Sequence, residues 1–105
     1  MFKVLVIDDT EDVRMLTTDM LSMNGYDVTA VVSGMEGLEA ARRCPPDLVL
    51  CDVQMPGWDG FETFAQLRAV PALANIPFIF LTGMGDKPLI RRGMELGADD
   101  YLTKP

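Results

Sequence analysis

Apolar residues gather in five short runs along the chain, and helical spacing of apolar and polar positions separates them. Apolar runs of roughly 4–8 residues, bounded by turn-forming residues, are typical of buried strands. The runs predict strands over Lys3–Ile7, Tyr26–Val31, Asp47–Cys51, Ile76–Leu81 and Asp100–Lys104. The third run is nearly continuous in apolar residues, which indicates a strand that is covered on both faces.

Four helices are predicted between these strands, over Thr10–Met23, Met35–Arg43, Phe61–Ala69 and Pro88–Leu96. The first has an apolar face at positions i, i+3, i+7 and i+8, formed by Val13, Leu16, Met20 and Leu21. Thr10 is expected to cap this helix with its side chain. Gly37 weakens the prediction of the second helix, because glycine disfavours helix interiors. Strict alternation of strand and helix predicts an α/β protein with a parallel sheet and helices on both faces.

Polar residues follow four of the strands at the point where each strand ends. Asp8 and Asp9 follow the first strand. Asp52 follows the third strand, Thr82 follows the fourth, and Lys104 ends the fifth. The carboxyl ends of parallel strands meet at one edge of the sheet, where open α/β sheets bind ligands. Three carboxylates, a hydroxyl and an ammonium at this edge predict a site for a divalent cation and a phosphoryl group.

The residue types suggest separate roles at this edge. Mg²⁺ prefers oxygen ligands, and it would relieve the repulsion between neighbouring carboxylates. The Asp52 carboxylate can act as a nucleophile on phosphorus. Lys104 offers a positive charge to a phosphoryl oxygen and Thr82 offers a hydrogen bond. Each residue also has an ordinary alternative, as a solvated strand end or an exposed terminus.

Composition narrows the function classes. The 105 residues fit one domain, and the net charge of −7 argues against direct nucleic-acid binding by this domain. The sequence contains no histidine, which excludes histidine-based catalysis and histidine metal ligands in this chain. Cys44 and Cys51 lack metal-ligand spacing, and Cys51 is expected to be a buried thiol. No signal peptide or membrane span is apparent, so a cytoplasmic location is expected.

The order and spacing of several motifs resemble the receiver domains of two-component response regulators, including the chemotaxis regulators. The motifs are Asp8-Asp9, Asp52, Met55–Gly60, Thr82, Gly97–Tyr101 and Lys104-Pro105. The resemblance covers the whole chain. It implies a flavodoxin-like, doubly wound sheet of five parallel strands in the order 2-1-3-4-5. It also implies a phosphorylation-dependent signalling switch rather than a metabolic enzyme, with self-phosphotransfer and slow autodephosphorylation only.

The resemblance implies a role for each site residue. Asp52 would accept a phosphoryl group from a phosphohistidine on a sensor histidine kinase or a histidine phosphotransfer protein. Asp9 and Asp52 would bind Mg²⁺ directly, with Asp8 assisting and the backbone carbonyl of Gln54 as a further ligand; Mn²⁺ is an expected substitute. Lys104 would contact the phosphoryl group, and its bond to Pro105 would be cis. Thr82 and Tyr101 would form the switch pair, which alters the surface of the fourth helix and fifth strand.

Some features depart from the family pattern. Gly83 stands where alanine is frequent, and Gln54 and Met84 flank the expected pocket, so the lifetime of the phosphoryl group stays open. The sequence stops at Pro105, where the family ordinarily adds a fifth helix. Residues 1–105 are therefore expected to form a receiver domain truncated before that helix, with part of one sheet face bare. The output domain, attached or separate, and a homodimer also stay open.

Two rival functions stay open. A phosphohydrolase with an aspartate nucleophile would want a second acid two residues after it, and this chain has Gln54 there. An FMN-binding module would want serine, threonine or glycine after the first strand, where Asp8 and Asp9 would repel phosphate. A protein-interaction domain that is never phosphorylated is a third alternative, which no feature of the sequence favours.

Overall fold

A computed structural model describes residues 1–83 and 87–103. The strands are β1 (Lys3–Ile7), β2 (Asp27–Val31), β3 (Leu48–Asp52), β4 (Phe78–Thr82) and β5 (Asp100–Thr103). The helices are α1 (Glu11–Met23), α2 (Gly34–Arg43), α3 (Gly60–Arg68) and α4 (Lys87–Glu95). Every predicted strand and helix is present, and each described bound lies within two residues of its prediction; Lys104, the predicted end of the last strand, lies outside the described residues. A short 3₁₀ helix, η1 (Pro71–Leu73), was not predicted.

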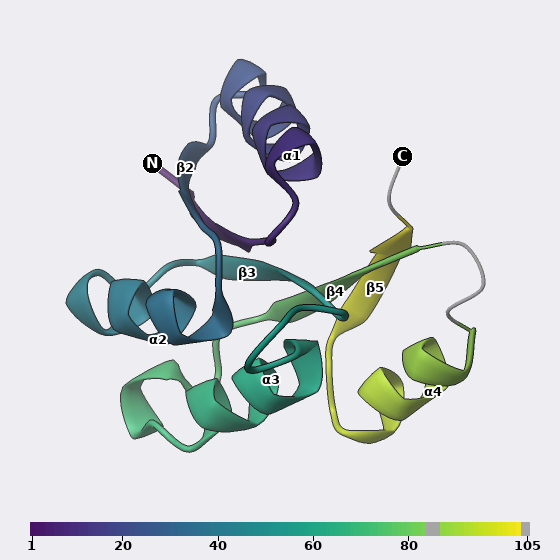
Figure 1. The fold of residues 1–105 in the computed structure, drawn as a ribbon. Helices are drawn as coiled ribbons and strands as arrows, with labels where there is room; N and C mark the ends of the chain where they lie inside the picture. The colour runs from purple at the N-terminus through teal and green to yellow at the C-terminus, as the bar shows by residue number, and fades with distance from the viewer. Residues whose placement is uncertain (84–86, 104–105) are drawn as a thin grey trace.

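The five strands form one parallel sheet in the order β2-β1-β3-β4-β5, as predicted (Figure 1). The register pairs Ile7 with Cys51, and Asp52 with Leu81. It also pairs Thr82 with Thr103 at the far side of β4. The carboxyl ends of β1, β3 and β4 therefore lie side by side, which is the arrangement that the candidate site requires.

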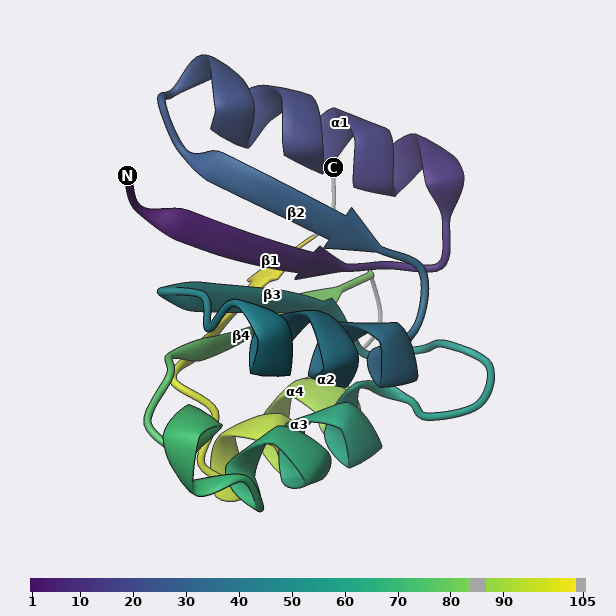
Figure 2. The same cartoon turned by 90° about the vertical axis from the view of Figure 1, so that its left-hand side faces the viewer.

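The helices cover the two faces of the sheet unequally. Figure 2 shows α1 on one face and α2, α3 and α4 on the other. The core beneath α2, α3 and α4 is rich in aromatic residues: its larger members are Ile7, Phe61, Phe64, Leu67, Phe78 and Phe80. The α1 face has a smaller buried cluster of Val4, Val6, Leu50 and Leu81. Burial of these apolar side chains is the main favourable term for folding.

The face beside α1 carries an apolar groove of about 300 Å³. It is lined by Val13, Thr17, Met20, Leu21, Leu50, Leu81, Leu102 and Thr103. Met20 and Leu102 are exposed there. Among residues 1–83 and 87–103, no helix is long and apolar enough to cross a membrane.

The local signals for helix α1 were only half right. Thr10 occupies the N-cap position in an extended conformation, but its side chain makes no capping hydrogen bond. Its backbone carbonyl accepts the first helical hydrogen bond, from the Arg14 backbone amide at 2.9 Å, and its own amide donates to the Asp8 carboxylate. The Asp8 side chain therefore engages the chain at the helix start, which a rule based on Thr10 alone could not foresee.

Gly37 has a packing reason to lie inside α2. A Cβ atom at this position would stand 2.4 Å from Cδ1 of Ile7, which is too close for a real contact. Glycine lets α2 approach β1 closely, and Ile7 fills the space that a side chain would otherwise take. The helix forms despite the unfavourable propensity, because burial against the sheet outweighs it.

Candidate functional site

Three carboxylates meet at the carboxyl edge of the sheet. Asp8 and Asp9 follow β1, and Asp52 ends β3, the neighbouring strand. One carboxylate oxygen from each lies within 4.8 Å of the others. The side chain of Asp8 is fully buried, Asp52 is 4% exposed, and Asp9 faces solvent. The sequence prediction that these acids come together is confirmed.

Hydrogen bonds of both the backbone and the side chain hold the chain in place around Asp8. Its amide donates to the Val31 carbonyl at 3.2 Å, which extends the pairing of β1 and β2. Its carboxylate accepts from the Thr10 amide at 2.9 Å, and its carbonyl accepts from Nη1 of Arg14 at 2.9 Å. These bonds fix the turn between β1 and α1, and with it the direction of the Asp8 carboxylate.

Arg14 is a residue that the sequence reasoning missed. It lies in the first turns of α1 and is half-buried. The start of a helix favours acidic side chains, because its amides carry partial positive charge. A basic residue so close to a helix start and to an acidic pair was the available signal.

Asp52 and Cys51 lie together at the end of β3. The Asp52 carboxylate accepts a hydrogen bond from the backbone amide of Gln54 at 3.4 Å. Cys51 is fully buried, and burial raises the pKa of its thiol well above the usual range, with the charges of Asp52 and Asp8 adding to the effect. Cys51 is therefore a buried thiol in the core, as expected from the sequence.

Thr82 lies on β4, the strand next to β3, and Tyr101 lies on β5, on the far side of β4. Thr82 is fully buried at the end of β4, and its hydroxyl donates to the Leu102 carbonyl at 3.4 Å. Tyr101 lies on β5 opposite Phe80, and its side chain is 40% exposed. The strand register brings Thr82 to the same edge as the acids. Lys104, its bond to Pro105 and Met84 lie outside the described residues.

The donor set fits a small divalent cation. Two of the three carboxylates are buried, and close burial of like charges is costly unless a cation offsets them. Carboxylate oxygens are hard ligands of the kind that Mg²⁺ takes, usually with several waters retained. Gln54 lies in the exposed loop after β3, where its backbone carbonyl is the expected further ligand. The three acids at this edge of the sheet can therefore hold such an ion.

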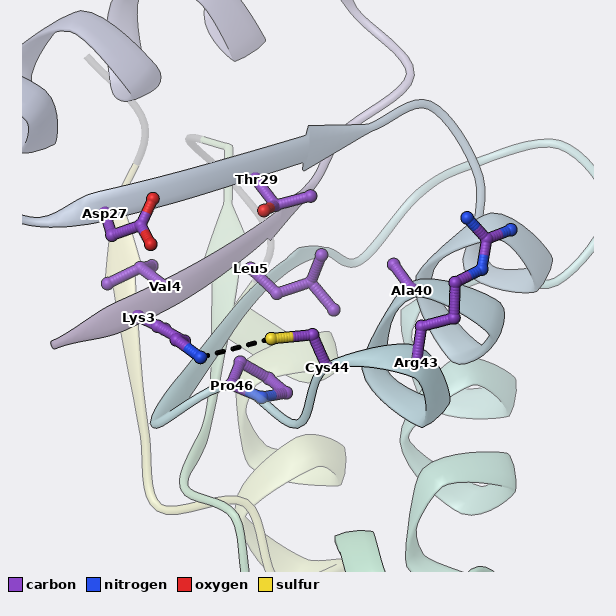
Figure 3. Close-up of a pocket in the computed structure, with 9 residues that line it drawn as sticks. All are labelled: Lys3, Val4, Leu5, Asp27, Thr29, Ala40, Arg43, Cys44 and Pro46. Atoms are coloured by element: carbon purple, nitrogen blue, oxygen red, sulfur yellow. Dashed lines mark hydrogen bonds between the residues drawn. The ribbon is translucent and has the colours of Figure 1, made fainter. Parts of the chain in front are cut away.

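A separate cavity of about 230 Å³ lies at the opposite, amino end of β1 and β2 (Figure 3). Lys3 Nζ donates to Sγ of Cys44 at 3.2 Å across this cavity, and this hydrogen bond is the main cause that raises the pKa of Lys3. The Lys3 amide donates to the Asp47 carboxylate at 2.7 Å. These contacts tie the start of β1 to the segment after α2. The cavity holds none of the predicted site residues.

The chain matches the family model described as "Response regulator receiver domain" over residues 4–105. The chain belongs to the response regulator receiver domain family. Its fold agrees with that of solved receiver proteins. A putative response regulator from Chloroflexus aurantiacus has a TM-score of 0.94 at 36% identity, covering 99% of this chain and 85% of that one. The chemotaxis protein CheY4 of Vibrio cholerae has a TM-score of 0.93 at 31% identity, covering 100% and 88%.

Among curated proteins, this receiver domain is similar to the "DNA-binding dual master transcriptional regulator RpaA" of Synechocystis. The two are 40% identical over 103 residues, which is 98% of this chain and 43% of RpaA. The chain thus spans less than half of that relative's length. Membership of the receiver family confirms the resemblance seen in the sequence. The acid cluster therefore belongs to a signalling domain.

Proposed function

We propose that this receiver domain takes a phosphoryl group on Asp52 from a phosphohistidine of a sensor histidine kinase or a histidine phosphotransfer protein. The cluster of Asp8, Asp9 and Asp52 at the sheet edge carries the proposal, since its carboxylate oxygens lie within 4.8 Å of one another. Family membership supports the same conclusion. We place the receiver unit at residues 1–105.

In the proposed transfer, a carboxylate oxygen of Asp52 attacks the phosphorus of the phosphohistidine in line with the bond that breaks. A P–O bond forms as the P–N bond breaks, and the electron pair of that bond returns to the imidazole nitrogen of the partner. The product is an acyl phosphate on Asp52. Attack by water on its phosphorus then releases inorganic phosphate slowly and regenerates the carboxylate.

Asp8, Asp9, Asp52 and the Gln54 carbonyl would hold Mg²⁺, with Mn²⁺ as a substitute. The bound ion would supply positive charge that offsets the carboxylates and the phosphoryl oxygens. Asp8 is suited to a positioning role, because its carboxylate also accepts from the Thr10 amide at 2.9 Å. Asp9 is exposed and can meet an ion that arrives from solvent.

The switch in this proposal begins at Thr82. Its hydroxyl donates to the Leu102 carbonyl at 3.4 Å, a long bond that a phosphoryl oxygen on Asp52 would outcompete. Thr82 would then turn toward the phosphoryl group, and Tyr101 would move into the vacated space. Lys104 would contact another phosphoryl oxygen. The surface formed by α4 and β5 would change as a result, which is a two-state response to a local charge.

The output is proposed to come through a further domain, attached or separate, since the printed name of the similar RpaA includes DNA binding and this chain covers 43% of it. The net charge of −7 supports the view that the receiver domain itself does not bind nucleic acid. A homodimer and a cytoplasmic location belong to the same proposal.

The test is incubation with acetyl phosphate and Mg²⁺, followed by peptide mapping of the modified residue. Modification at Asp52, lost in Asp52→Asn, is the expected result. Modification at another residue, or none, would contradict the proposal. The same protein is assayed with a small phosphate ester and Mg²⁺. Steady turnover of that ester would favour the phosphohydrolase alternative instead.

A further inference from the structure

Helix α4 lies very close to the core at Gly93. This glycine is buried, and a Cβ atom built on it would lie 2.8 Å from two ring carbons of Phe80 and 3.5 Å from Phe61. The contact requires glycine, because a methyl group would push the helix or the ring away. Phe80 and Phe61 pack edge to face, with centroids 5.3 Å apart. The rings of Phe61, from α3, and Phe80, from β4, therefore form the surface on which α4 packs.

Arg92, the preceding residue, adds a second contact to the same pair of rings. Its guanidinium carbon lies 4.5 Å from the centroid of the Phe61 ring, which is cation–π geometry. Arg92 belongs to α4 and Phe61 to α3, so the contact joins two neighbouring helices. We call the contacts of Arg92 and Gly93 with Phe61 and Phe80 the α4 seat.

Both rings of the α4 seat are close in sequence to the phosphoryl-acceptor site. Phe80 lies on β4, two residues before Thr82, and Phe61 lies at the start of α3, after the loop that follows Asp52. A shift of β4 or of the β3–α3 loop would therefore reach α4 through these rings. A cavity of about 480 Å³, lined by Gln54, Met55, Pro56 and Arg92 among others, lies between that loop and α4. Arg92 therefore faces that loop as well as the Phe61 ring.

We propose that Arg92 and Gly93 are positioning residues that hold α4 on Phe61 and Phe80 and carry the change at Asp52 and Thr82 to the α4 surface. This inference rests on the proposed function. The alternative is that Arg92 is an ordinary surface cation and Gly93 only fills space. Under that alternative, removal of the Arg92 side chain would leave the response of α4 to phosphorylation unchanged.

Hydrogen exchange of the α4 amides, followed by mass spectrometry with and without acetyl phosphate and Mg²⁺, tests the α4 seat. Arg92→Ala is compared with Arg91→Ala, which removes the same charge from an exposed position on the same helix. Without phosphate, Arg92→Ala is expected to speed hydrogen exchange of α4 by about 2- to 5-fold. The free energy of an exposed cation–π contact corresponds to a factor of that size in the equilibrium for local opening. Arg91→Ala is expected to match the wild type. The change of α4 exchange on phosphorylation is expected to shrink in Arg92→Ala alone.

Gly93→Ala is a second variant, with a larger expected effect in the same direction. Intact mass separates the two proposals, because it reports phosphorylation independently of α4. Wild type that gains no phosphoryl group would overturn both the proposed function and the coupling. Normal phosphorylation with α4 exchange in Arg92→Ala equal to that in Arg91→Ala would overturn the α4 seat alone. If Gly93→Ala does not fold, the comparison of Arg92→Ala with Arg91→Ala still decides between the two explanations.

Discussion

Arg14 reaches back from α1 and donates to the backbone carbonyl of Asp8 at 2.9 Å. This bond joins the first turns of the helix to the turn that carries two of the three site carboxylates. Because the donor is charged and half-buried, we expect Arg14→Met to lower the free energy of unfolding by about 1.5 kcal/mol. Urea unfolding measures it. Arg42→Met is the control, since it removes the same charge from an exposed site in α2; an equal effect there would refute a specific role for Arg14.

The acid cluster predicts a stability change that depends on Mg²⁺. Asp9→Asn removes the exposed member of the cluster, so in EDTA we expect it to stabilise the fold by about 0.5–1 kcal/mol through reduced repulsion. For the wild type, Mg²⁺ at ten times its Kd should add about 1.4 kcal/mol. Thermal or urea unfolding checks both values. In Asp19→Asn, a change at an exposed position on α1, the stabilisation by Mg²⁺ should persist. If Asp9→Asn also keeps it in full, Asp9 is not a ligand.

Thr82 allows a test that separates modification from response. Thr82→Val keeps the volume of the side chain but removes the hydroxyl that donates to Leu102. We expect Asp52 to gain a phosphoryl group in this variant, while the change in hydrogen exchange of α4 is lost. Thr82→Ser, which restores a hydroxyl, should recover that change. If the full change in α4 hydrogen exchange persists in Thr82→Val, a hydrogen bond from this hydroxyl to the phosphoryl group is not needed for the response.

Cys51 gives the stability a dependence on alkaline pH. Its pKa is raised in the folded state, mainly by burial, so the folded protein holds the thiol proton more tightly than the unfolded chain does. The resulting stability is fully present below the ordinary thiol pKa of about 8.5 and is lost as the pH rises toward the folded value. Wild type should therefore lose more stability between pH 7 and pH 10 than Cys51→Ala does. An equal loss of stability in the wild type and in Cys51→Ala would be the contrary result.

The fold was predictable because its signals are local. Apolar runs such as Val4–Ile7 and the alternation of strands with helices specify a parallel sheet, and the polar residue after each run then falls at one edge. Contacts between distant segments were not predictable in this way. Gly37 weakened a helix prediction by its propensity, and only its contact with Ile7 explains it. The α4 seat likewise joins segments that are distant in the sequence, whereas Arg14 is only six residues from Asp8 and had a local signal.

The contact of Gly37 with Ile7 can itself be tested. Glycine to alanine in a helix interior normally stabilises by about 1 kcal/mol. Here we expect Gly37→Ala to destabilise by about 1–3 kcal/mol, because the new methyl overlaps Cδ1 of Ile7. Ile7→Val removes that carbon, so the double variant should recover part of the loss. Chemical unfolding of the single and double variants decides; additive effects of the two changes would argue against the overlap.

The central claim is phosphorylation of Asp52 with help from the acid cluster. Intact mass after incubation with acetyl phosphate measures it most directly, in Mg²⁺ and in EDTA, for wild type and Asp52→Asn. We predict that wild type in Mg²⁺ gains the mass of one phosphoryl group, and that EDTA or Asp52→Asn abolishes the gain. Wild type that stays at its original mass in Mg²⁺, or an equal gain in Asp52→Asn, would contradict the claim.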